Sequence, residues 1–314
     1  MKFERNQVLL AKVESTQGTD AEPTAAANAI KSAVIGVTID GQELTDPTIK
    51  GSISAEPKRY TNKTVTLSIP VVLKGSGEAG TAPEISPLLQ CCACKETVVS
   101  TLGSEEVNYK PVNTAADMKT TTVYIYKDGL LIKVVGCMGN FTLSSPAGEF
   151  ATITFNLQGK FAGATDATNP ASPTYQNVDP VEVKAYGLTF GSWDDGIIRD
   201  FGFETGNTIV SRKNLNAPDG LEPFFVTARD PIWNTTLEAV SESESSFFDY
   251  FDDRTQTALT FTHGSVAGNK VIFNAPKANY DPPTMSSEDS ILMYGLGGQL
   301  LENSGEDNFT LTFK

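Results

Sequence analysis

The sequence is poor in the side chains from which most catalytic and metal sites are built. Its 314 residues include one histidine, four cysteines and two tryptophans. A Ser/His/Asp or Cys/His arrangement would have to use His263, which lies in a predicted hairpin turn and is expected at the surface. We therefore predict that the protein is not an enzyme and has no catalytic residues.

The few cysteines do not form a convincing metal site. Cys91, Cys92 and Cys94 lie in one segment, while Cys137 stands apart from them. Zinc normally takes four ligands, and the single histidine is far away in the sequence. We expect small buried thiols on a helix that faces the core, and no bound metal. So long a chain with so few cysteines also gives no disulfide framework.

Acidic pairs and tryptophans carry no clear chemistry either. Asp194-Asp195 and Asp252-Asp253 are adjacent pairs, and neighbours on a strand point to opposite faces, so we do not expect them to act together as general acids. Trp193 and Trp233 lie in strand-like runs, where packing in the core is a commoner role than stacking on a carbohydrate.

One glycine-rich loop matches a cofactor motif by letter. Gly75–Gly80 reads GSGEAG and follows a predicted strand. A dinucleotide loop must open directly into a helix, but Thr81-Ala82-Pro83 intervenes here. The residue pair that a P-loop needs is missing as well. We interpret the segment as a flexible loop and predict no cofactor.

Long apolar runs and an excess of basic charge are also missing. No apolar run approaches the length of a membrane-spanning helix, and the first residues lack the apolar core of a signal peptide. We expect a protein made in the cytoplasm. Residues 1–164 hold 15 basic and 16 acidic side chains, and residues 165–314 hold 9 and 22. This balance argues against gripping nucleic acid, although not against a surface that nucleic acid slides past.

What the sequence does contain is the same order of elements twice. Each half shows strands, a short helix, a hairpin-like pair and an alternating closing strand. The helix, hairpin and closing strand are Glu84–Cys94, Thr122–Gly136 and Phe150–Phe161 in the first half, and Ser241–Asp253, Leu259–Phe273 and Asn308–Lys314 in the second. Units of about 150 residues are too long for a solenoid and suit a duplicated small domain.

The repeat predicts an all-β chain of two tandem β-sandwich domains, each with one short flanking α-helix. We place an extended N-terminal arm at 1–33, the first domain at 34–164, a linker at 165–180 and the second domain at 181–314. Proline and small polar residues mark the linker. The helices are expected near 86–95 and 242–252.

Capping residues define the two helix starts. Ser86 is expected as the N-cap of the first helix, with Pro87 at the first helical position. Ser241 or Ser243 is expected to cap the second. The apolar stripes of the two helices should face the core. Their members are Leu88, Leu89 and Cys92 in the first helix, and Phe247, Phe248 and Phe251 in the second.

Several segments lack an apolar period of their own. Residues 1–30 read as an extended arm, and 57–63 and 211–223 read as charged connectors between strands. The strands on either side of the first connector are expected at Thr48–Glu56 and Thr64–Lys74. We expect the arm and both connectors to contact neighbouring subunits.

Three stretches resemble a known family. Arg5–Ile30, Thr120–Leu143 and Gly148–Phe161 are similar to major tail tube proteins of long-tailed bacteriophages and prophages. The resemblance implies a β-sandwich with a flanking helix and an extended loop, so that EISPLLQCCAC and SSFFDYF would be the flanking helices. It covers most of the first half and reaches the second half only through the repeat.

The resemblance also implies a role in the virion. Most tube proteins carry one such domain and form hexameric rings, so a chain with two copies is expected to form trimeric, pseudo-hexameric rings. Stacked rings would surround the tape measure protein, meet the tail terminator and tail tip proteins, and later pass DNA without binding it specifically. The chain is then expected in the virion tail, assembled in the host cytoplasm. The alternative is a virion decoration protein or another β-sandwich binding or adhesion protein.

Overall fold

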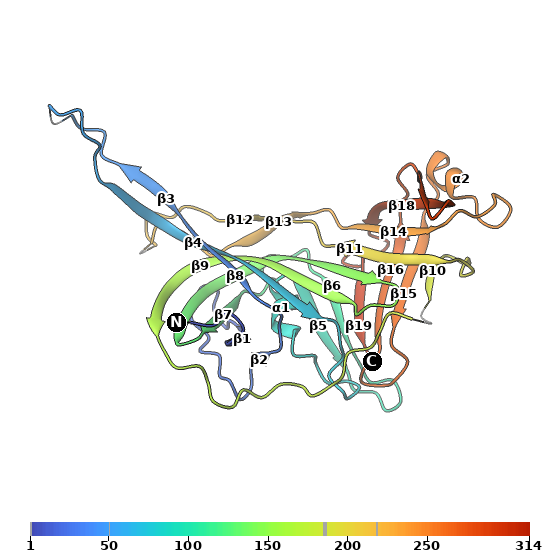
Figure 1. Cartoon of the computed structure of the whole chain (residues 1–314), viewed down its shortest axis with the longest axis horizontal. Coiled ribbons are helices and arrows are strands. Elements are labelled where there is room, and N and C mark those ends of the chain that lie inside the picture. The colour runs from blue at the N-terminus through green and yellow to red at the C-terminus, as the bar shows by residue number, and fades with distance from the viewer. Residues whose placement is uncertain (1, 50, 185–186, 218) are drawn as a thin grey trace.

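The computed structural model describes residues 2–49, 51–184, 187–217 and 219–314, and its fold is all-β with two short helices (Figure 1). The predicted fold class is therefore confirmed. Alternation of apolar and polar residues along the strands sends one set of side chains into the core and the other to the surface.

The first half holds one helix and nine strands. They are β1 (Gln7–Val13), β2 (Ala29–Ile30), β3 (Gly36–Thr45), β4 (Lys58–Val72), α1 (Ser86–Gln90), β5 (Cys94–Val99), β6 (Glu106–Pro111), β7 (Thr121–Lys127), β8 (Leu130–Pro146) and β9 (Thr152–Asp166).

The described residues of the second half form one helix and ten strands. They are β10 (Leu188–Phe190), β11 (Ile198–Glu204), β12 (Asn207–Val210), β13 (Phe225–Arg229), β14 (Ile232–Glu238), α2 (Phe247–Asp252), β15 (Thr257–His263), β16 (Val271–Ala278), β17 (Thr284–Glu288), β18 (Ile291–Leu301) and β19 (Thr310–Phe313).

The same antiparallel strand order occurs in both halves. In the first half neighbouring strands follow the order β1-β7-β8-β9-β4-β3. In the second half the order is β10-β15-β16-β18-β14-β11. The long strand β8 matches β16 and β17 taken together, and the end of β9 matches β19. The β5–β6 hairpin, which was not predicted, has no counterpart in the second half.

This pairing corrects one predicted correspondence. The closing strand Phe150–Phe161 was matched with Asn308–Lys314, but the partner that occupies its place beside β14 is β18. Only the last residues of β9 correspond to β19. A loop interrupts the second closing strand between β18 and β19, so its two parts are separated in the sequence.

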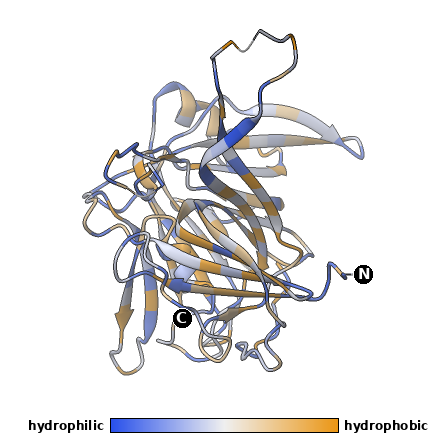
Figure 2. Cartoon of the chain, turned by 90° about the vertical axis from the view of Figure 1, so that its left-hand side faces the viewer, coloured by the Kyte–Doolittle hydropathy of each residue, from blue (hydrophilic) through white to orange (hydrophobic). Residues whose placement is uncertain are grey.

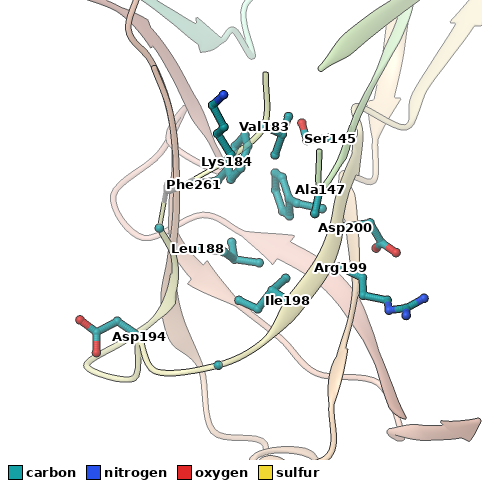
Figure 3. A pocket seen from close by; sticks show the side chains of 13 residues that line it. Ser145, Ala147, Val183, Lys184, Leu188, Asp194, Ile198, Arg199, Asp200 and Phe261 are labelled. Atoms are coloured by element: carbon teal, nitrogen blue, oxygen red, sulfur yellow. The ribbon is translucent and has the colours of Figure 1, made fainter. Parts of the chain in front are cut away.

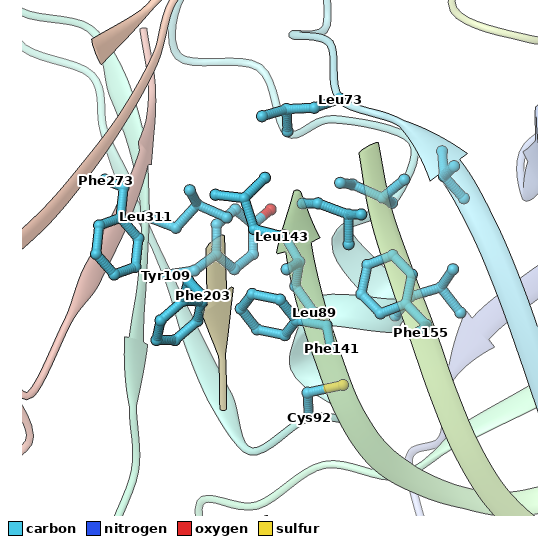
Figure 4. Close-up of a cluster of buried hydrophobic side chains, with 14 of the residues drawn as sticks. Leu73, Leu89, Cys92, Tyr109, Phe141, Leu143, Phe155, Phe203, Phe273 and Leu311 are labelled. Atoms are coloured by element: carbon cyan, nitrogen blue, oxygen red, sulfur yellow. The ribbon is translucent and has the colours of Figure 1, made fainter. Parts of the chain in front are cut away.

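Strand pairing also crosses between the halves at two seams. The C-terminal part of β8 pairs with β11, and β19 pairs with β6 on its free side. Buried side chains from both halves therefore form one large core, part of which is shown in Figure 4. Phe141 of β8 lies at the first seam, and its ring centroid is 5.6 Å from that of Phe203 on β11.

The first helix starts one residue earlier than predicted. Ile85 is the N-cap, and Ser86 and Pro87 are the first helical residues. Ser86 makes no cap hydrogen bond, because its hydroxyl donates to the Glu96 carboxylate on β5 instead. Leu88 and Leu89 are fully buried, as the apolar stripe predicts.

The second helix is shorter than predicted. It begins after Ser246, and Ser241 belongs to a preceding turn, where its hydroxyl and backbone N–H both donate to Glu244 at 2.9 Å. The expected caps at Ser241 and Ser243 are therefore wrong. Phe247 is buried but Phe251 is exposed, because a helix of six residues presents little more than one turn to the core.

The N-terminal segment is part of the fold. β1 pairs along its whole length with β7, and its apolar residues Val8–Ala11 are buried. The buried Glu14 carboxylate accepts hydrogen bonds from the backbone N–H groups of Gly18 and Gly136 and from the hydroxyls of Thr120 and Thr122, at 2.6–2.8 Å. We expected residues 1–30 to lack the apolar residues needed to pack on their own domain, and this expectation is wrong. The four buried residues of β1 are enough to hold it in the sheet between β2 and β7.

The segment between the halves has no regular structure but is held in place. Lys74 and Glu84 form a buried ion pair with 3.2 Å between Nζ and Oε1. Gln176 accepts from Lys74 Nζ at 2.8 Å through its backbone carbonyl, and from the Glu84 backbone N–H at 2.7 Å through its side chain. The predicted linker 165–180 therefore crosses the first half along a fixed path.

Two hairpins extend from the body. We call them the first arm and the second arm, and both differ from the N-terminal segment that was predicted as an extended arm. The first arm consists of the outer parts of β3 and β4 and the tip 46–57. The second consists of β12, β13 and the tip 211–224. Both run toward the left-hand side in Figure 1. Apart from Lys50, which lies outside the described residues, Thr48–Glu56 is loop instead of the predicted strand, and 58–63 belongs to β4.

Candidate assembly surface

The single histidine is in the core and not at the surface. His263 ends β15, is 1% exposed and stacks on Phe261 with 6.4 Å between ring centroids. Burial lowers the pKa of the imidazole. The predicted surface position is wrong, because the turn begins only at Gly264, where φ is +85°. His263 therefore packs in the core beside Phe261.

The four cysteines are free and buried. Burial raises the pKa of Cys94 to about 12 and holds that of Cys92 and Cys137 well above the usual range. Such thiols stay protonated and unreactive near neutral pH. Within the described ranges, no three His, Cys, Asp or Glu side chains lie close enough to hold a metal ion.

The glycine-rich loop packs against the second half. Gly77 N–H donates to Gly268 O at 2.9 Å, and Gly75 N–H donates to the Asn269 side chain at 2.8 Å. A Cβ at Gly75 would lie 2.0 Å from Gly268 O, so the close approach requires glycine. The segment is a contact between the halves and not the flexible loop that was predicted.

Two further observations concern surface features. Asp194-Asp195 and Asp252-Asp253 are exposed, in a turn and at the C-terminal end of α2. Trp233 is fully buried, as predicted, while Trp193 is half-buried. In the part of the chain that the structure covers, no helix is long and apolar enough to cross a membrane.

The largest regular surface is the outer face of the sheet that runs from β3 to β17. Its strands lie in the order β3-β4-β9-β8-β11-β14-β18-β17, and the pairing crosses the first seam without a break. Small, mostly polar side chains lie in rows across it. One row is Pro70, Thr154, Thr142, Glu204, Ile232 and Gln299, and the next is Thr152, Ser144, Gly202, Asn234 and Gly297.

Acidic side chains predominate among the charges on this outer face. The charged side chains that the regular pairing places there are Asp40, Asp200, Glu204, Glu238, Glu288 and Lys160, and Arg199 at the register break of β11 forms an ion pair with Glu288. A surface of this composition repels phosphate over about one Debye length, which is about 8 Å at physiological salt. It offers DNA few positive charges to bind.

The first seam shows how one half joins the next. Thr142 pairs with Glu204, and Ser144 pairs with Gly202. Beneath these residues Phe141 and Phe203 are each 2% exposed. Phe203 also packs on Phe309, with 4.8 Å between ring centroids. Pairing therefore removes two sheet edges from water and buries the aromatic side chains next to them.

Matching rows give the positions that correspond to this seam in the other half. Ile39, Val65 and Gly159 form one row in the first half, and Phe203, Trp233 and Gly298 form the same row in the second. Ile39 therefore occupies the place of Phe203. Counting an equal number of residues from this row along β9 and along β18 gives the partners of these strands that correspond. Met285 of β17 then occupies the place of Phe141 of β8, and Ser286 occupies the place of Thr142.

These corresponding positions lie at the two ends of the sheet. Among the described strands, β3 pairs only with β4, and β17 pairs only with β18. Ile39 is 50% exposed and Met285 is 61% exposed. Apolar side chains on unpaired sheet edges are typical of surfaces that another strand covers.

The second arm lies on the first half of its own chain. Arg229 donates to the backbone carbonyls of Ala93 and Val112 at 3.3 and 3.1 Å, and to the Asn207 side chain at 3.1 Å. Asn207 in turn donates to the carbonyls of Cys92 and Gly139 at 3.0 Å. Burial lowers the pKa of the Arg229 guanidinium.

The tip of the second arm reaches the base of the first. Lys160 Nζ lies 2.9 Å from Asp219 Oδ2 and also donates to Leu221 O. Phe224 and Val226 are buried with Met118 and Met138 of the first half. Backbone hydrogen bonds, an ion pair and apolar contacts together hold this arm in place.

The first arm has no such support. Figure 2 views the molecule from the side toward which the arms point, and this arm stands clear of the body. Ile49 and Ile53 in its tip are fully exposed. Strand pairing between β3 and β4 and contacts between side chains of the arm, such as the Lys58–Glu43 ion pair at 2.9 Å, hold its described residues together.

A cavity lies beside the first seam, between β8, β10 and β11 (Figure 3). Its volume is about 170 Å³, and its lining includes Ser145, Leu188, Ile198, Arg199 and Phe261. Mixed polar and apolar groups line it, and no cluster of catalytic type faces it. We interpret it as a packing defect where two sheets diverge.

The residues at the first seam and at the two sheet edges were not found from the sequence. Ile39, Met285, Phe141 and Phe203 look like ordinary strand residues, and no local pattern distinguishes an edge strand from an inner one. The repeat does carry a signal. When the two halves are aligned by strand order, large aromatic residues of one half correspond to smaller apolar residues of the other.

Comparison with known proteins identifies one family. The model of the family described as phage tail tube protein matches residues 4–299. A comparison with curated proteins gives no match. The family match spans both halves, including the second half, where the resemblance rested only on the repeat.

Proposed function

The chain belongs to the phage tail tube protein family, and on that basis we propose that three copies close into a ring of six similar units. Members of this family are structural proteins of the virion tail that assemble into a tube with other tail proteins. In the proposed ring each chain contributes two units, residues 34–164 and 181–314. The repeated strand order supports two units, with β1 as part of the first unit in addition to residues 34–164.

The observation that carries the proposal is the first seam. Within one chain, β8 joins β11 and buries Phe141 against Phe203. The corresponding strands β17 and β3 are free and expose Met285 and Ile39 at the same places. If β17 of one copy pairs with β3 of the next, every unit has the same neighbours along this sheet, and the sheet from β3 to β17 has no free edge in the ring.

The outer face of the sheet is the proposed lining of the tube. In a closed ring it becomes continuous, and small neutral side chains with acidic ones among them would let DNA pass without binding. Near Ile39 the acid Asp40 adds to this charge, whereas Glu288 near Met285 is paired with Arg199. A neutral or basic bore in an assembled ring would contradict this part of the proposal.

The remaining roles follow from a tube of this kind. We propose that the tube surrounds the tape measure protein, ends at the tail terminator and tail tip proteins, and is assembled in the host cytoplasm. No catalytic activity or cofactor is part of the proposal. Assembly by the purified chain would separate a tube protein from a decoration protein, which needs a capsid lattice.

The experiment is assembly by edge variants. Electron microscopy and sedimentation of the purified protein should show rings or tubes, with three chains in each ring. Ile39→Asp and Met285→Lys each place a charge where an apolar contact is expected, so assembly should fall by about tenfold or more while the circular dichroism spectrum stays unchanged.

Val266→Lys is the matched control. Val266 is 68% exposed but lies in the turn between β15 and β16, away from both edges. This variant should assemble like the wild type. Wild-type protein that forms no rings, or edge variants that assemble as well as Val266→Lys, would refute the proposed ring.

A further inference from the structure

The two arms correspond in position but differ in their surroundings. Asn207 pairs with Arg229 in the second arm, and Gln42 pairs with Thr61 at the corresponding place in the first. Both pairs follow a break in strand register that tilts the arm away from its sheet. The second arm lies on a surface of its own chain, whereas the first extends beyond it (Figure 1).

We propose that the first arm lies on the second half of the neighbouring copy in the ring, where it packs beside the C-terminal end of α2. This inference rests on the proposed function, because it takes the neighbour's position from the β17–β3 contact. The contacts of the second arm provide a template for the arrangement.

The template identifies the receiving surface. Arg229 and Asn207 bind the carbonyls of Ala93 and Cys92, directly after α1. Ala93 has φ +57°, and Arg254 after α2 has the same φ of +57°. The corresponding receiving turn is therefore the one at Asp253 and Arg254.

Acidic side chains outnumber basic ones on this receiving surface. Asp252, Asp253 and Asp281 are all exposed there, together with one exposed base, Arg254. Tyr250 of α2 and Tyr280 pack with 5.2 Å between ring centroids, which places Asp281 next to the end of the helix. The second half as a whole holds 22 acidic against 9 basic side chains after residue 164.

The face of the first arm that would meet this surface carries a complementary charge. Gln42, Leu44, Arg59 and Thr61 share that face, because Gln42 pairs with Thr61 and Leu44 pairs with Arg59. Leu44 and Arg59 are exposed. Lys58 and Glu43 lie on the opposite face and pair with each other. Arg59 is therefore placed to face Asp252 and Asp253 of the neighbour.

The β5–β6 hairpin explains why the two arms differ. It supplies Val112 near the second arm, and the second half has no equivalent hairpin. The proposed contact of the first arm therefore lacks one carbonyl acceptor and part of the apolar area that the contact of the second arm has. Charge complementarity compensates for both. Such an interface depends more strongly on salt than the contact of the second arm does.

Charge reversal tests the contact. Arg59→Glu should raise the protein concentration needed for assembly by about tenfold, and Asp253→Arg in the same chain should restore most of the loss. Thr45→Glu, which places a negative charge beside Lys58 on the opposite face of the same arm, is the matched control and should assemble nearly normally. Equal effects of Arg59→Glu and Thr45→Glu, or no rescue, would overturn the inference.

Cross-linking identifies which copy receives the arm. All four native cysteines are buried, so the pair Arg59→Cys and Asp253→Cys can be oxidised selectively. A contact within the ring gives linked species that end at three chains. A ladder beyond three chains shows contact with the next ring and overturns the inference, as does the absence of any link in assembled protein. Wild-type protein without rings would instead refute the proposed function.

Discussion

Burial of His263 makes the stability of the protein depend on pH. The pKa of the folded-state imidazole is lowered, whereas that of an unfolded chain lies near about 6.5. As the pH falls, the unfolded state binds the proton first, so its population is favoured. Neutral His263 contributes its full stability when the pH is above the pKa of His263 in the unfolded chain. This stability is lost as the pH falls toward the lower pKa of His263 in the folded protein.

The wild type should therefore lose unfolding free energy between about pH 7 and pH 5.5, where most carboxylates remain ionised. His263→Gln should lack this part of the pH dependence, because the chain has no other histidine. Urea unfolding at several pH values measures both. Parallel pH profiles of the two proteins would contradict the assignment.

Individual residues were predictable from the sequence where burial follows from apolar pattern. Leu88, Leu89 and Trp233 lie where the sequence places them. His263 was missed because the turn was expected to include it, whereas β15 continues to His263 and pairs it with Val271 of β16. Glu14 was missed because its four donors come from three separate segments.

At the scale of elements, β19 ties the two halves together. Leu311 is 1% exposed and lies between Phe273 of β16 and Tyr109 of β6. Leu311→Ala should lower the unfolding free energy by about 2–5 kcal/mol, the usual cost of such a truncation in a core. Because both halves share this core, denaturant unfolding should remain a single transition.

Thr310→Ala is the control for this prediction, since Thr310 is half-buried and its neighbour Leu311 supplies the core contact. Its effect should be within about 1 kcal/mol. Two resolved transitions in the wild type, of which Leu311→Ala shifts only one, would show that the halves unfold independently and would contradict the shared core.

Strands and hairpins with local signals were predicted better than those defined by long-range pairing. The hairpin of β7 and β8 has an Asp-Gly turn between alternating strands, which is a strong local signal. The short strands β5 and β6 lack such a signal. β1 looked like an extended arm because its neighbours in the sheet, β2 and β7, lie far along the sequence or are very short.

At the scale of the whole molecule, the duplicated order explains how one chain can build a closed assembly. The contact between β8 and β11 is already made inside the chain, so in the proposed ring only the equivalent contact between copies has to form during assembly. The sequence predicted the all-β class and the repeat, but sheet edges and seams arise only when distant strands come together.

The most direct test of the ring is a disulfide across the proposed β17–β3 contact. Ser286 corresponds to Thr142, and Asp40 corresponds to Glu204, two residues that pair directly at the first seam. Paired strand residues lie within disulfide reach. Assembled protein carrying Asp40→Cys and Ser286→Cys should be oxidised to species of one, two and three chains on a non-reducing gel. A product of six chains, or no cross-link in assembled protein, would contradict the three-chain ring.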